Sequence, residues 1–206
     1  MKPLIYPEDL PEQYCGSYHD TMSFKKLCSN SKAESAYRIL FNRLVNVHEW
    51  HDYAGSVGAR FVLTDSQGQA IRCIPGEGLY IKIDLMAPGS HAGHGSDWVR
   101  IEEVKDQHTD FDNYFMFRTV PSVNPAEHGS AIAHFYGHEA SSTFIISQKG
   151  KRISAEVHGR NEEVNVEDAG LIDRMRNRLV KVGAALGIAK IEWKQLTDGL
   201  LDFEWR

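Results

Sequence analysis

The fold is organised around residues 131–165, which read AIAHFYGHEASSTFIISQKGKRISAEVHGRNEEVN. Within this stretch, apolar and polar residues alternate from Ser142 to Ser147 and again from Arg152 to Arg160. A period of two is typical of β-strands, because successive side chains of a strand point to opposite faces. Gly150 lies between the two runs and supplies the positive φ that a tight turn requires. The stretch therefore predicts a β-hairpin.

The register of this hairpin predicts two unlike faces. If Lys149-Gly150 forms a two-residue loop, Ile146 pairs with Ile153 and Phe144 with Ala155, so one face is apolar. On the other face, the same loop pairs Thr143 with Glu156 and Ser141 with His158, and Arg160 follows on that side. This polar face is either solvated, as one side of an antiparallel sheet often is, or it lines a binding site.

Two amphipathic helices are predicted to flank a run of strands. Residues 31–34 form a capping box, and the apolar residues after them recur at spacings of three and four as far as Val47. The same spacing from 167 to 186, ended by Gly187, predicts a longer helix that lies on a sheet. Alternation predicts the remaining strands at 21–28, 60–64, 69–74, 78–85, 98–104, 111–120 and 132–136.

These elements predict an α+β fold in which a curved, largely antiparallel sheet of about seven strands packs on the long C-terminal helix. The order of elements from Thr21 to Gly187 resembles the helix-grip arrangement of START-like lipid and small-molecule binding proteins. By analogy, the resemblance implies a cavity between the sheet and that helix. An antiparallel β-barrel with outer helices is the alternative architecture.

Length and composition predict one soluble domain that spans residues 1–206. The first 30 residues contain three prolines and are expected to form an extended arm on the domain. The tail at 188–206 is rich in Trp, Leu and Phe, so we expect it to pack on the domain or on a second copy, which would make a homodimer.

Net charge, hydropathy and cysteine content argue against some classes of protein and predict the state of the thiols. A net charge of −5, with basic residues spread along the chain, argues against nucleic-acid binding. No apolar run approaches the roughly 20 residues that a membrane span requires. Cys15, Cys28 and Cys73 are odd in number and lack metal-ligand spacing, so we expect reduced thiols and a cytoplasmic location.

Four further residues are candidates for a site because of their neighbours. His48 and His51 end the first helix, but their spacing of three differs from the i, i+4 spacing of zinc proteases, so they are expected to pack in the core or line a pocket. Arg118 and His134 lie among aromatic residues.

The segment 86–97 is rich in Gly and His and is either a lid or a surface loop.

Three functions stay open from the sequence. In the first, Arg118, His134, His158 and Arg160 orient a small, partly apolar ligand in the cavity. Thr143, Glu156, His48 and His51 complete that predicted set. In the second, a histidine partnered by Glu156 or Glu162 performs the acid–base chemistry of a hydrolase or isomerase. The third is a structural or partner-binding protein. We expect no metal and no cofactor, and the sequence does not decide whether the chain is an enzyme.

Overall fold

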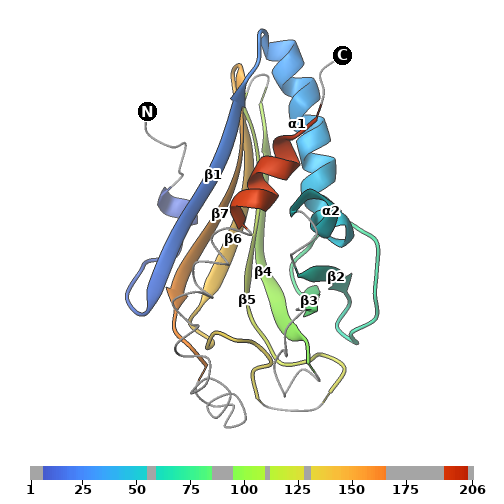
Figure 1. Cartoon of the computed structure of the whole chain (residues 1–206), viewed down its shortest axis with the longest axis vertical. Coiled ribbons are helices and arrows are strands. Elements are labelled where there is room, and N and C mark those ends of the chain that lie inside the picture. The colour runs from blue at the N-terminus through green and yellow to red at the C-terminus, as the bar shows by residue number, and fades with distance from the viewer. Residues whose placement is uncertain are drawn as a thin grey trace.

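Seven strands form one open, curved antiparallel sheet in the computed structural model (Figure 1), which describes residues 7–54, 59–84, 95–109, 112–127, 131–165 and 193–203. The spatial order is β1-β7-β6-β5-β4-β3-β2, so the first strand of the chain lies beside the last one. The strands are β1 (Ser17–Lys26), β2 (Arg60–Thr64), β3 (Tyr80–Asp84), β4 (Asp97–His108), β5 (Asp112–Pro121), β6 (Ser141–Lys149) and β7 (Arg152–Glu162).

The helices lie on one face of this sheet, except for η1, which lies on the opposite face. They are η1 (Pro7–Asp9), α1 (Asn30–Val45), η2 (Val47–Glu49), α2 (Trp50–Ala54) and a helical segment over 193–201. Helix α1 begins one residue before the predicted capping box, because the hydroxyl of Ser29 accepts a hydrogen bond from the Lys32 N–H at 3.2 Å. No helix in the described ranges is both long and apolar enough to cross a bilayer.

The predicted α+β class, the seven antiparallel strands, the curved sheet and a C-terminal helix are confirmed. The sheet has β1 and β2 at its two ends and does not close, so the barrel alternative is wrong. The long helix predicted at 167–186 lies outside the described residues, as does most of the 86–97 segment. The C-terminal helix that the structure describes is the shorter one at 193–201.

The central hairpin has the predicted faces but a different register. Lys149 pairs with Arg152, so the two-residue loop is Gly150-Lys151. Gly150 has the predicted positive φ, at 56°, but it occupies the first loop position, which is where type II′ turns place glycine. The predicted loop put glycine second. Each residue therefore meets a partner two positions from the predicted one, and a shift of two keeps every side chain on its face.

Two predicted strands do not form. Residues 69–74 make one isolated bridge, from Ala70 to Thr64, and Ile71 packs on the core, but residues 72–74 are exposed, so no buried face stabilises further pairing. The segment 132–136 is irregular because side chains occupy its backbone groups. The Asn165 amide donates to the carbonyls of Ile132 and His134, and the Asp97 carboxylate accepts from the Phe135 N–H at 3.1 Å.

We call the side of the sheet that packs against α1 the helix-bearing face. This face is covered by aromatic and aliphatic side chains, centred on Trp50, which is fully buried and lies 4.9 to 6.1 Å, between ring centroids, from Phe61, Phe117 and Phe144. Burying each such ring contributes on the order of 1.5–3 kcal/mol. The segment 193–201 covers this core with three further buried residues, Leu196, Leu200 and Leu201.

The opposite side, the outer face, is crossed by the N-terminal segment 7–16. At one end Asp9 forms an ion pair with Lys105 at 2.5 Å, and Leu10 packs against Met116 and its apolar neighbours. At the other end the Asn161 side chain accepts hydrogen bonds from the backbone N–H groups of Tyr14 and Cys15, and donates one to the Glu12 carbonyl. These contacts fix the segment to the sheet.

Candidate functional site

The structure brings four of the predicted site residues together on the outer face. Thr143, Glu156, His158 and Arg160 share that face, and Arg118 joins them because β5 pairs Arg118 with Thr143. A single cross-strand row then continues from Thr143 to His158 and on to Asp20 of β1. The predicted strip therefore exists, although α1, α2 and the helical segment 193–201 lie on the other side of the sheet from it.

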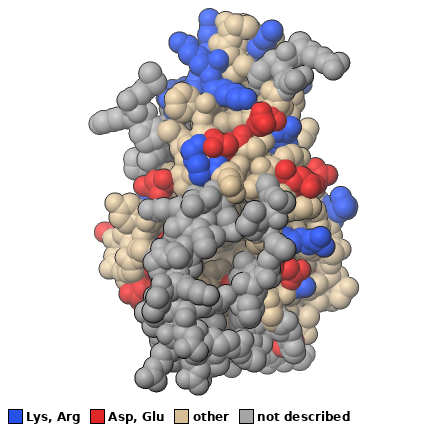
Figure 2. Space-filling model, viewed as in Figure 1, with Lys and Arg blue, Asp and Glu red and all other residues tan. Residues whose placement is uncertain are grey.

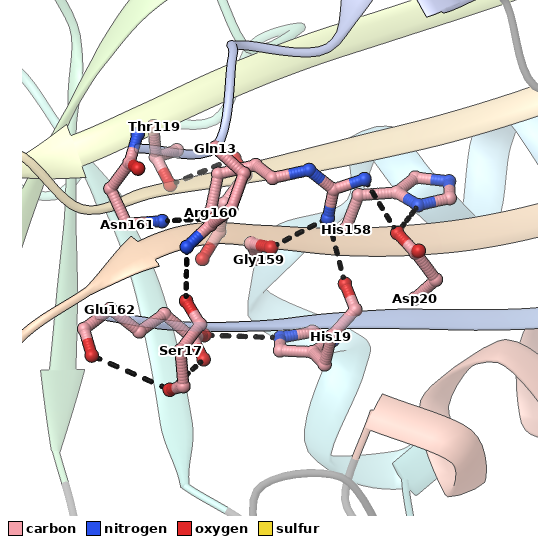
Figure 3. Close-up of polar contacts among 11 residues, drawn as sticks. Gln13, Ser17, His19, Asp20, Thr119, His158, Gly159, Arg160, Asn161 and Glu162 are labelled. Atoms are coloured by element: carbon pink, nitrogen blue, oxygen red, sulfur yellow. Dashed lines mark hydrogen bonds and ion pairs between the residues drawn. The ribbon is translucent and has the colours of Figure 1, made fainter. Parts of the chain in front are cut away.

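His158 lies between two carboxylates in this strip. Its Nδ1 is 2.6 Å from Asp20 Oδ1, and its Nε2 is 3.1 Å from Glu156 Oε2. Both carboxylates have a further donor. Arg160 reaches Asp20 at 2.8 Å, and the Ser154 hydroxyl donates to Glu156 at 2.8 Å. Figure 3 shows the His158 and Arg160 side chains converging on Asp20.

Most hydrogen-bond partners of these polar side chains come from within the network itself. Burial raises the pKa of Asp20, but hydrogen bonds from His158 and Arg160 and the charges of both outweigh burial and hold that pKa below its ordinary value. Arg160 also donates to two backbone carbonyls, those of His19 and Gly159, at 3.2 and 2.7 Å. His158 and Arg160 are buried and paired, so a ligand-binding role for them stays a prediction.

Arg118 has carboxylate partners of its own. It forms ion pairs with Glu102 and Glu103, which leaves its guanidinium half-buried and engaged. The hydroxyls of Ser141 and Thr143, beside it on β6, are buried and have no hydrogen-bond partner. They are the unused polar groups of this strip.

The three other predicted histidines lie elsewhere. His48, in η2, contacts the Ile71 carbonyl through Nε2 at 2.8 Å, and His51, in α2, forms an ion pair with Asp52. Neither contacts the outer-face strip in the described ranges. His134 lies in the irregular segment, where its Nδ1 accepts from the Tyr136 N–H at 2.9 Å. In its neutral form His134 therefore carries its proton on Nε2.

A second polar cluster occupies the helix-bearing face, at the corner where β1 meets the end of β7. His19 pairs with Gly159 and Ser17 with Glu162, so three residues of β7 span the length of two residues of β1. Such a bulge turns the following side chain to the other face of the strand. It occurs at Asn161, whose φ of 53° is left-handed, a conformation that Asn tolerates better than most residues.

The bulge places the Glu162 carboxylate against His19. Glu162 Oε1 lies 3.3 Å from His19 Nε2, and the Ser17 hydroxyl donates to the other carboxylate oxygen at 3.2 Å (Figure 3). A glycine is required beneath this pair, because a Cβ on Gly159 would lie 2.5 Å from His19 Cδ2 and closer still to the carboxylate. The imidazole and the carboxylate therefore lie flat on the β7 backbone.

His19 is buried but not satisfied. Only 4% of the residue is exposed, yet neither ring nitrogen has a hydrogen bond of good geometry. The contact of Nε2 with Glu162 is an ion-pair distance, and Nδ1 has no partner in the described part of the chain. A buried polar atom without a partner costs about 1–3 kcal/mol, so a protein seldom retains one without a reason.

The charge of Glu162 also reaches the irregular segment. Burial lowers the pKa of His134, against the opposing influence of the Asp97 and Glu162 charges. Burial and the Glu162 charge together raise the pKa of Tyr136, so its hydroxyl stays protonated. His134 and Tyr136 thus belong electrostatically to the same corner as His19.

Comparisons with known proteins concern the fold alone. No protein-family model and no curated protein sequence matches the chain. The chain is similar to the solved structure of an uncharacterised protein from Bacillus thuringiensis, at 16% identity over 90% of this chain and 100% of that chain, with a TM-score of 0.42. It is also similar to norcoclaurine synthase from Thalictrum flavum in complex with dopamine and hydroxybenzaldehyde, at 8% identity, 92% and 90% coverage and a TM-score of 0.38. The chain is similar as well to the crystal structure of Ara h 8.0201, at 9% identity over 91% of this chain and 100% of that chain, with a TM-score of 0.36.

Sequence reasoning missed His19, Ser17 and the position of Glu162. Strict alternation along β7 puts Glu162 on the same face as Arg160, and only the left-handed Asn161 reverses this. A usable signal was present, because Asn next to a charged residue at a strand end is a common site for a bulge or turn. The pairing of β1 with β7 had no local signal at all.

Proposed function

We propose that the chain binds a small, partly apolar molecule on the helix-bearing face of the sheet, between the sheet and the C-terminal part of the chain. The polar end of the molecule lies at His19. The observation that carries this proposal is the buried imidazole of His19, whose Nδ1 has no partner among the residues that the structure describes. A ligand group that occupies this nitrogen would remove the penalty of leaving it unpaired.

The tautomer of His19 suggests which group that is. Glu162 faces Nε2, so the proton of a neutral imidazole belongs on Nε2, and Ser17 holds the carboxylate in place from its other oxygen. Nδ1 is then a hydrogen-bond acceptor. The matching ligand group is a donor, such as a hydroxyl or an N–H.

The surroundings support an apolar remainder. Next to His19 on the same face, the sheet continues into Val157 and Phe144, both buried in the aromatic core. Binding sites for small molecules combine an apolar wall with a few polar groups that fix orientation, and this face has both within one sheet. On the outer face, the apolar cluster of Tyr114, Met116 and Ile145 is already packed against Leu10 of the N-terminal segment.

The test begins with what the purified protein carries. Native mass spectrometry of untagged protein should show an adduct, and an organic extract of it should raise the melting temperature of stripped protein by mass action. His19→Gln keeps a donor near the Nε2 position but has no acceptor at Nδ1, so we expect the adduct and the melting shift to be lost. Ser141→Ala is the matched control, since it removes an unpartnered buried hydroxyl on the outer face.

Retention of the adduct in His19→Gln together with its loss in Ser141→Ala would move the site to the outer face. Absence of any adduct, and of any melting shift with the extract, would contradict small-molecule binding. Both variants must keep the wild-type circular dichroism spectrum for the comparison to count.

The acid–base alternative has one observation in its favour. Ser17, Glu162 and His19 form a chain in which a hydroxyl orients a carboxylate and the carboxylate orients an imidazole. In an enzyme of this kind, the extracted compound would change chemically when it is incubated with wild-type protein and stay unchanged with His19→Gln. Unchanged compound in both samples would leave binding as the function.

A further inference from the structure

One end of the molecule concentrates positive charge. At this end, which we call the basic tip, the hairpin between β6 and β7 turns, β1 ends and α1 begins. Lys26 pairs with Arg152 across β1 and β7, Arg152 pairs with Lys149 across the hairpin, and the Leu27 N–H donates to the Lys151 carbonyl at 2.8 Å. Six basic residues share the tip, namely Lys25, Lys26, Lys32, Lys149, Lys151 and Arg152. Figure 2 shows Lys and Arg atoms gathered at the upper end of the molecule.

The charges of the tip are not neutralised locally. Within the described part of the chain, none of the six residues forms an ion pair. Asp112 lies opposite Lys149 on the neighbouring strand, but its carboxylate accepts a hydrogen bond from the Gly150 N–H at 3.3 Å. Other surface cations do have carboxylate partners, as Arg38 has in Glu34 and Lys194 in Asp198. Single cations without an ion pair, such as Arg72 and Arg100, also occur elsewhere among the described residues, so what distinguishes this end is the number of them that gather there.

The rest of the chain has the opposite sign. The whole sequence has a net charge of −5, so removing the six positive charges of the tip leaves −11 on the remaining 200 residues. A molecule polarised in this way turns its positive end toward an anionic surface, while its other end is repelled. A surface that attracts it must be recognised by the tip alone.

The tip also exposes apolar surface next to its lysines. Phe24 is 50% exposed on the outer side of β1, and the Arg152 guanidinium lies 4.1 Å from the centroid of its ring. Leu27, three residues further on, is half-buried. Basic residues beside an exposed aromatic ring suit the boundary of a bilayer, where cations meet headgroups and the ring enters the interfacial layer.

We infer that the basic tip docks the protein on a bilayer surface rich in anionic phospholipid. The occupant is a lipid surface rather than a nucleic acid because the β6–β7 turn, the end of β1 and the start of α1 meet at one end of an elongated molecule (Figure 1), where they can contact a plane together. Sequence-reading proteins instead place a helix or a β-ribbon along a groove. No part of the chain needs to enter the hydrocarbon for this contact.

The test measures co-sedimentation of the full chain with vesicles. We expect binding to vesicles of phosphatidylcholine with 30 mol% phosphatidylserine, and little binding to phosphatidylcholine alone. Each Lys or Arg near such a surface contributes about a fivefold change in partition, so Lys149→Ala with Lys151→Ala should weaken binding on the order of 25-fold. The matched control is Arg72→Ala with Arg100→Ala, which removes the same charge from two exposed positions away from the tip.

Added salt gives a second readout. Because the contact is between exposed charges, 0.5 M NaCl should abolish binding. Equal binding to both kinds of vesicle, or equal loss in the two double variants, would overturn the inference. Binding to a DNA or RNA duplex in place of the anionic vesicles would overturn it too, and would identify the tip as a nucleic-acid contact. The four substituted side chains are exposed or lie at the hairpin turn, so unchanged circular dichroism spectra are expected throughout.

Discussion

The two faces of β7 are equally buried but are held in different ways. On the helix-bearing face, Ala155 and Val157 are 0% and 1% exposed and pack in the apolar core. On the outer face, Glu156 and His158 are each 1% exposed and are held by hydrogen bonds and ion pairs with neighbouring strands. The first arrangement needs only complementary shape, whereas the second needs every partner to be present.

The difference teaches which polar residues are informative about function. The outer-face strip is the most polar part of β7, but its ionic groups form hydrogen bonds and ion pairs with one another. His19, on the helix-bearing face, is an imidazole at the polar end of an apolar surface. Its Nδ1 has no hydrogen-bond partner among the described residues. Density of polar residues therefore identifies a structural network here, while an unpaired buried atom identifies the better candidate for a ligand.

The largest expected effect comes from breaking the outer-face network. Glu156→Ala removes one carboxylate from His158 and leaves the Ser154 hydroxyl without its acceptor, so we expect a loss of about 3–5 kcal/mol in the free energy of unfolding. Urea denaturation measures it. Ile145→Val, directly opposite on β6, is the control and should cost about 0.5–1.5 kcal/mol. A loss in Glu156→Ala no larger than in the control would mean that pairing does not hold this face.

The next effect concerns the polar corner of the helix-bearing face. Gly159→Ala introduces a Cβ into the space that His19 and Glu162 occupy, so we expect a loss of about 1–3 kcal/mol from overpacking, and loss of any ligand that contacts His19. Gly137→Ala is the control, because its Cβ would meet nothing nearer than the Glu163 carbonyl at 3.9 Å. Similar melting temperatures for the two variants would show that the corner is loosely packed.

A change at the hairpin turn should affect both faces alike. Gly150→Ala puts a Cβ on a residue with φ of 56°, and we expect a cost of about 1 kcal/mol, measured by thermal unfolding. The variant should keep its ligand and its pH dependence, since it touches neither polar cluster. An unchanged melting temperature would contradict the strained turn.

The smallest expected effect is a pH dependence of stability that comes from Asp20 on the outer face. The pKa of Asp20 is lowered in the folded chain, so its ionised form contributes stability above its unfolded pKa of about 3.9, and that contribution is lost as the pH falls through the folded value. The urea midpoints of wild type and Asp20→Asn should therefore differ at pH 6 and converge toward pH 3. A constant difference across this range would show that the carboxylate charge is irrelevant.

The sequence predicted what depends on local periodicity. Alternation assigned Phe144 and Ile146 to one face of the hairpin and Thr143 and Glu156 to the other, and the structure confirms that division. The register was wrong by one turn position, because alternation does not distinguish a glycine in the first loop position from one in the second. The predicted faces were still correct, because the pairing partners moved by two residues and a shift of two keeps each side chain on its face.

What the sequence did not predict depends on distant contacts. His19 lies on β1, and its neighbours Gly159 and Glu162 come from the far end of the chain, so no window of sequence contains the cluster. The bulge at Asn161 then reverses the alternation at the one position where it matters. Residues 132–136 failed as a strand for a similar reason, since the side chains that occupy their backbone come from Asp97 and Asn165.

The pairing of the first strand with the last also sets the order of assembly. Lys26 meets Arg152, so about 125 residues must be made and brought round before β1 finds its neighbour, and closing so long a loop is an entropic cost that earlier contacts do not share. At synthesis rates of about 5–20 residues per second, β1 waits roughly 6–25 seconds with its backbone edge unpaired before β7 emerges. His19 and Glu162 therefore meet only after β7 has been made, and a folding intermediate that lacks β1 would have the apolar core without the cluster of Ser17, His19 and Glu162.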